Sequence, residues 1–198
     1  MQFAKARGLR VIGIDARDEG LELARRHDAD VVADARALQE AVVAEVRRAV
    51  LAASATVSNK GETKTGPQAA EYEGADATLV LSDAPGAAAL GCALTRMHGT
   101  LVQIAQPEHV AVPFPELVFR DIRLRGSVLC SPRESEDMVR LVAEMRRGGG
   151  AGTAFEVSTV PFRGLDSVAE LVRFVESGKL MGKAVVVVDD TQVGVWKV

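Results

Sequence analysis

The chain has 198 residues, of which 47% are hydrophobic and 26% are charged, and its formal net charge is −3 at pH 7. A chain of this length can bury roughly 70% of its unfolded surface, and this composition is typical of globular proteins and not of disordered chains. The chain has 24 basic and 27 acidic residues, so it has no net positive charge that would attract a nucleic acid.

The first half of the chain alternates strand-like and helix-like segments. Leu9–Ile14 is an apolar run that predicts a buried strand ending at Asp15, and Gly20–His27 has the spacing of a helix packed on a sheet. Val31-Val32 predicts a second short strand, and Ala37–Ala53 a helix with an apolar face. The polar residues from Ser54 to Gly74 then predict a surface loop.

The second half repeats this alternation. Strands are predicted at Ala77–Leu81, Thr100–Ala105, Ile122–Leu129, Ala154–Val160 and Lys183–Val188. Helices are predicted at Gly86–Met97, from Pro132 to a stop at Gly148–Gly150, and at Leu165–Glu176 with a stop at Gly178. Strands that alternate with helices predict an α/β fold with a mostly parallel sheet.

Cysteines and apolar runs indicate the compartment. Cys92 and Cys130 are the only cysteines and form no metal-binding or disulfide pattern. No apolar run approaches the roughly 20 residues that cross a bilayer, and the first residues do not follow the pattern of a signal peptide. We expect a soluble cytoplasmic protein without a membrane or nucleic-acid partner.

Asp15 is the candidate site residue that the pattern itself singles out. An acidic side chain at the end of a strand in a dinucleotide-binding sheet accepts hydrogen bonds from the adenosine ribose hydroxyls. Asp is also a common residue at a helix start, so Asp15 could simply cap the helix that follows. The residue pattern leaves both interpretations open.

Other catalytic motifs are absent from the sequence. It contains no GxGxxG and no GxSxG, and the cluster Gly148-Gly149-Gly150 follows a helix where a phosphate-binding loop would precede one. The histidines, His27, His98 and His109, lie far apart with no ligand partner at helical spacing, so we assign them no role.

The serial order of several segments resembles the zinc-type medium-chain alcohol dehydrogenase family. Met1–Gly8 and Leu9–Asp15 are similar to the helix after the family's glycine loop and to its second strand. Further segments are similar to later parts of the same domain: Ala29–Asp34, Gly74–Ala77, Gly99–Pro107, Ile122–Ser127 and Gly178–Val187. The resemblance covers about residues 1 to 190, with residues 191–198 as a tail.

This resemblance implies a doubly wound Rossmann-like parallel sheet, lacking the family's first strand and glycine-rich loop. It implies NAD as the small-molecule cofactor, with Asp15 on the adenosine ribose, although Arg17 leaves NADP open. Four residues would line the nicotinamide and adenine channel, and Lys183 would lie near the pyrophosphate where the family usually has Arg. The four are Ser82, Ile104, Ser127 and Leu129.

Three departures from the family limit the implied activity. Gly20 replaces a lysine that often contacts the adenosine side, and Ser54–Glu73 is longer and more polar than expected. The zinc ligands of the full-length family are not present in this sequence. We therefore expect an oxidoreductase portion inactive by itself. The alternative is a non-catalytic nucleotide-binding or dimerisation module, in which strands from Phe114–Leu117 through Val128 meet a second copy.

Overall fold

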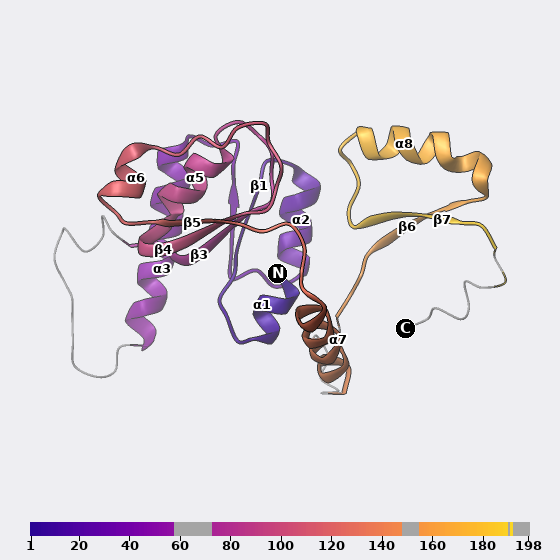
Figure 1. The fold of residues 1–198 in the computed structure, drawn as a ribbon, viewed down its shortest axis with the longest axis horizontal. Coiled ribbons are helices and arrows are strands. Elements are labelled where there is room, and N and C mark those ends of the chain that lie inside the picture. The colour runs from indigo at the N-terminus through magenta and orange to yellow at the C-terminus, as the bar shows by residue number, and fades with distance from the viewer. Residues whose placement is uncertain (58–72, 148–154, 190, 192–198) are drawn as a thin grey trace. The chain divides into compact units, whose positions relative to one another are not determined.

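The computed structural model describes residues 1–57, 73–147, 155–189 and 191 (Figure 1). Contacts divide the chain into two compact units, one made of Met1–Val32 with Glu134–Val198 and the other of Ala33–Arg133. The fold class of alternating parallel strands and helices is confirmed. The expectation of one domain over residues 1–190 stays a prediction.

The first unit begins with α1 (Gln2–Ala6), followed by β1 (Ile12–Asp15) and α2 (Asp18–Arg26). Leu21 and Ala24 on α2 are buried, and this helix packs on β1. Acidic residues occupy the first turn of α2 and basic residues its last turn, which matches the helix dipole. β1 pairs with β2 (Val31–Asp34) as a two-stranded sheet, so the predicted strand ending at Asp15 is confirmed.

The last part of the same unit is a second βαβ element. β6 (Thr159–Arg163) and β7 (Lys183–Val187) pair in parallel, and a 3-10 turn (Leu165–Ser167) and α8 (Val168–Glu176) connect them. α8 lies along this pair of strands in Figure 1. Gly178 has a φ of 73° just after the helix, a conformation that favours glycine, and the predicted helix stop is confirmed. α7 (Pro132–Arg147) precedes this element.

The second unit contains the best-packed sheet. β3 (Ala75–Val80), β4 (Thr95–Gln103) and β5 (Arg123–Gly126) lie in the order β3-β4-β5, and both pairings are parallel. α5 (Ala87–Leu94) packs on β3 and β4 and contacts α3 (Gln39–Val57), and α6 (Phe114–Val118) precedes β5. The buried core cluster of this sheet consists of Val80, Cys92, Leu101 and Ile122.

Four predicted elements of the second half were placed wrongly. The helix predicted to reach Met97 ends at Leu94, because Thr95 is already the first residue of β4. Phe114–Leu117 is helical, since Pro115 suits a first helical turn and cannot donate to a sheet ladder. The strand predicted at Ile122–Leu129 covers only Arg123–Gly126, and the last-but-one strand begins at Thr159, five residues later than predicted.

Some predictions fall on residues that the structure does not describe. α3 extends to Val57, so the first residues of the loop predicted at Ser54–Gly74 are helical, and most of the rest lies outside the described residues. The glycine stop at Gly148–Gly150 and the tail 192–198 also lie outside them. α7 is described as far as Arg147, and it begins at Pro132 as predicted.

Candidate functional site

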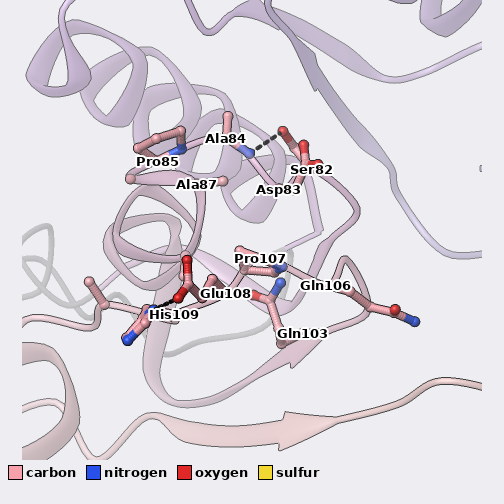
Figure 2. Close-up of a pocket in the computed structure, with 13 residues that line it drawn as sticks. Ser82, Asp83, Ala84, Pro85, Ala87, Gln103, Gln106, Pro107, Glu108 and His109 are labelled. Carbon is pink, nitrogen blue, oxygen red and sulfur yellow. Dashed lines mark hydrogen bonds and ion pairs between the residues drawn. The ribbon is translucent and has the colours of Figure 1, made fainter.

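A pocket of about 500 Å³ lies at the carboxyl ends of β3 and β4 (Figure 2). In parallel α/β sheets the loops at this end of the strands carry the ligand sites. Two segments line the pocket, Ser82–Ala88 after β3 and residues between Gln103 and Ala111 after β4. Parallel register brings them together, since Val80 pairs with Gln103.

The segment after β3 is a polar turn that leads into α5. The backbone N–H of Ala84 donates to Ser82 Oγ at 3.2 Å, which orders the turn at the rim of the pocket. Gly86 follows with a φ of 85° directly before α5. Ser82 is therefore a predicted site residue that does line a pocket, as Figure 2 shows.

Gln103 is a lining residue that sequence reasoning did not select. Its Nε2 donates to the backbone oxygen of Ala105 at 2.8 Å, while Oε1 is buried and accepts no hydrogen bond within the described part of the chain. A buried acceptor without a partner is costly, and such atoms often mark a place where a bound molecule supplies the donor. The signal in the sequence was the position of Gln103 at the carboxyl end of a strand.

Three predicted residues do not line this pocket. The backbone N–H of Ile104 donates to Val80 O at 3.0 Å, and that of Ser127 donates to Gln103 O at 3.0 Å. Leu129 is 88% exposed and follows the end of β5. None of these three is among the lining residues, so their proposed contacts stay predictions.

Asp15 ends β1 in the first unit, and its side chain is 29% exposed. The Arg17 side chain and backbone both donate to its carboxylate. Partial burial acts to raise the pKa of Asp15, but the hydrogen bonds and charge of Arg17 outweigh it and hold that pKa below its ordinary value. Asp15 is therefore a stable anion at neutral pH.

Gly20 determines the space beside this carboxylate. A Cβ atom at Gly20 would lie 2.0 Å from Asp15 Oδ2, so any side chain there would conflict with the present carboxylate position. The Asp15 carboxylate fills the space that a side chain would need at this glycine, which replaces the lysine that the resemblance led us to expect. Lys183, the other predicted site residue of the first unit, is exposed at the start of β7.

The cysteines and histidines do not form a reactive or metal-binding cluster in the part of the chain that the structure describes. Cys92 is buried, and burial raises the pKa of its thiol to about 11, so it is protonated at neutral pH. His98 Nδ1 lies 2.9 Å from Asp121 Oδ2, and both side chains are exposed. Among the described residues no group of three or more His, Cys, Asp or Glu could hold a metal ion.

Comparison with known proteins identifies the family. The family model described as zinc-binding dehydrogenase matches residues 1–144. The chain belongs to the zinc-binding dehydrogenase family. The match to this family covers most of the chain, including both strands that bound the pocket, so the resemblance inferred from the sequence is confirmed.

Two alcohol dehydrogenases are similar to this chain over most of its length. An alcohol dehydrogenase of Geobacillus stearothermophilus is 24% identical over 190 residues, which cover 96% of this chain and 47% of that protein. The structure of an alcohol dehydrogenase from Aeropyrum pernix matches with a TM-score of 0.70 and 20% identity, covering 94% of this chain and 45% of the other. The chain thus spans about half the length of these relatives.

A second similar structure was solved with a bound cofactor. A crotonyl-CoA carboxylase/reductase, AntE V350A, was solved in complex with NADP, and it matches with a TM-score of 0.64 and 16% identity over 94% of this chain and 45% of its own. The NADP in that structure belongs to AntE, and its likeness to this chain concerns the fold. No helix within the described residues has the length and apolar character needed to span a bilayer.

Proposed function

We propose that this chain is the cofactor-binding portion of an NAD-dependent alcohol dehydrogenase and is inactive towards alcohols by itself. The observation that carries the proposal is Asp15, an ionised and partly exposed carboxylate at the carboxyl end of β1 that packs against Gly20. NAD, when bound, supplies the hydride-accepting ring in such enzymes.

The residues of the first unit fit the adenosine end of the cofactor. The Asp15 carboxylate can accept hydrogen bonds from both ribose hydroxyls, and Lys183 offers a positive charge for the pyrophosphate. A 2′-phosphate on that ribose would meet the negative charges of Asp15, Asp18 and Glu19, the last two in the first turn of α2. This charge pattern favours NAD over NADP.

The pocket of the second unit fits the nicotinamide end. The unpartnered Oε1 of Gln103 is an acceptor for an amide or hydroxyl donor, and Ser82 supplies a hydroxyl at the rim. Backbone groups of Ile104, Ser127 and Leu129 would complete the channel. We propose with these roles that residues 1–190 form a doubly wound Rossmann-like domain with a cytoplasmic location.

The second candidate function is a non-catalytic module that dimerises. Exposed apolar side chains before and after β5 favour it: Phe114 is 64% exposed and Phe119 68% before the strand, and Val128 is 69% exposed after it. Such side chains would be buried against a second copy across a two-fold axis. The NADH titration below separates the two candidates, because a module with only this role gives no saturable binding.

Replacing Asp15 with Ala is expected to weaken NADH binding about tenfold, because hydrogen bonds to a charged acceptor are lost. NADPH binding should change less than threefold, since the same change also removes a negative charge facing the 2′-phosphate. Fluorescence titration of the 198-residue chain with each nucleotide measures both constants. Asp76→Ala is the control, because Asp76 is 88% exposed and paired with Arg96 at the start of β3. An equal loss for NADH and NADPH would assign Asp15 a structural role only, through its hydrogen bonds with Arg17.

The purified chain is expected to hold no stoichiometric zinc. A stable zinc site needs about four converging ligands, and the sequence contains only two cysteines and three histidines, without a cluster among the described residues. Inductively coupled plasma mass spectrometry of protein dialysed without chelator measures this. One zinc per chain that survives dialysis would contradict the prediction.

A further inference from the structure

Arg17 occupies both oxygens of the carboxylate that we assign to the ribose. Its backbone N–H donates to Asp15 Oδ1 at 2.9 Å, Nε donates to the same oxygen at 3.2 Å, and Nη2 donates to Oδ2 at 3.1 Å. The two side-chain hydrogen bonds form a bidentate pair, in which the guanidinium binds both oxygens of the carboxylate. A ribose diol would need the same two oxygens.

We propose that Arg17 is an internal competitor of the cofactor ribose, so that NAD binds only when the guanidinium leaves Asp15. This inference rests on the proposed function, because it takes Asp15 as the ribose ligand. Arg17 would then determine the affinity for NAD without touching the cofactor in the bound state.

A second contact holds the guanidinium in the competing position. Arg17 Nη1 donates to the backbone oxygen of Gly178 at 3.3 Å, across a sequence separation of 161 residues within the same unit. Gly178 follows the carboxyl end of α8, where the helix dipole is negative and attracts a cation. The Arg17 side chain is therefore attached at two points, and it is 51% exposed, so it can still swing into solvent.

The charges around Arg17 disfavour a second possible role, which is binding of the 2′-phosphate of NADP. A residue that receives the 2′-phosphate of NADP needs a neutral or positive setting, but Arg17 is followed directly by Asp18 and Glu19. Glu19 acts electrostatically on the guanidinium, as Asp15 does. Competition for Asp15 fits this setting better than recognition of a phosphate.

The chain contains a matched copy of this arrangement. Asp34-Ala35-Arg36 at the end of β2 repeats Asp15-Ala16-Arg17 at the end of β1, and the backbone N–H of Arg36 donates to Asp34 Oδ1 at the same 2.9 Å. The Arg36 side chain also pairs with both oxygens of Asp34. The residue five positions after Asp34 is Gln39 and not glycine. Arg36 is thus a control for the local motif without a glycine five positions after the aspartate.

The expected size of the effect follows from the exposure of the pair. An exposed ion pair favours the state in which Arg17 is bound to Asp15 by only a modest factor. The apparent affinity for NAD is the intrinsic affinity multiplied by the fraction of molecules in which Arg17 has left Asp15. Arg17→Ala should therefore tighten NADH binding about two- to sixfold at low salt. Salt screens such a pair, so the ratio of wild-type to variant dissociation constants should approach one in about 0.5 M NaCl.

The experiment is a titration of the full 198-residue chain with NADH and NADPH at two salt concentrations. Arg17→Ala is expected to tighten NADH in low salt only, Arg17→Lys to fall between the wild type and Arg17→Ala, and Arg36→Ala to leave both nucleotides unchanged. Unchanged or weaker NADH binding in Arg17→Ala overturns the competitor role and leaves the proposed function intact. Selective loss of NADPH in that variant would make Arg17 a phosphate receptor instead. No saturable binding in any variant would refute the proposed function, and the inference with it.

Discussion

Replacing Arg120 with Met is expected to lower the free energy of unfolding by about 3–5 kcal/mol, because the change leaves a carboxylate without its buried partner. The Arg120 side chain is 9% exposed and that of Glu116 is 19% exposed. Arg120 donates to Glu116 Oε2 and to the backbone oxygens of Thr95 and Cys92. One guanidinium therefore holds the end of α5, the start of β4 and α6 together. Urea unfolding of the full chain measures the loss.

A surface pair provides the control for this prediction. Arg140 pairs with Asp137 three positions before it on α7, but its side chain is 66% exposed, so Arg140→Met should cost less than about 1 kcal/mol. The double variant Glu116→Leu/Arg120→Met should recover part of the stability, because it no longer contains the unpaired Glu116 carboxylate. A loss below 1 kcal/mol in Arg120→Met would show that Glu116 reaches water easily in the folded chain.

Replacing Leu101 with Ala is expected to cost about 2–5 kcal/mol, since it opens a cavity where the sheet is most tightly packed. Leu101 is fully buried near the carboxyl end of β4 and belongs to the cluster with Val80, Cys92 and Ile122. A Cβ atom at Gly91 would lie only 2.8 Å from Leu101 Cδ1, so the helix backbone approaches this side chain closely. Thermal and urea unfolding report the change.

Leu79 on the neighbouring strand is the matched control for Leu101. It is 59% exposed, and Leu79→Ala should change stability by less than about 1 kcal/mol. Equal losses for the two variants would mean that β4 is not the centre of a packed core in solution.

Most strands and helices could be predicted from apolar periodicity, and the failures have physical causes. The sequence predicts a helix as far as Met97, but the helix ends at Leu94. Nothing in the local pattern marks this end, because the strand that begins at Thr95 depends on tertiary contacts. Thr95 Oγ1 donates to Gly91 O at 2.7 Å and forms a hydrogen bond with Thr78 Oγ1 on β3 at 2.8 Å. No residue pattern within the segment reveals a partner 17 positions away.

The candidate site was predictable where it depends on strand ends and not where it depends on side-chain conformation. The positions of Asp15 and Ser82 follow from the strands that precede them, because Asp15 ends β1 and Ser82 follows β3. The unpartnered oxygen of Gln103 and the contact of Arg17 with Asp15 could not be read from the sequence, because both depend on rotamers.

The parallel pairing of the sheets has a consequence for how this chain folds. A parallel pair cannot be closed by a tight turn, so Val80 meets Gln103 only after the chain has passed through α5, and Thr159 meets Lys183 only after α8. The entropy of closing these loops is lost before any strand contact compensates for it. Neither pairing can start from a local hairpin, and each depends on an early crossover helix. Changes that weaken α5 or α8 should therefore act on the rate of folding as well as on the stability of the folded state.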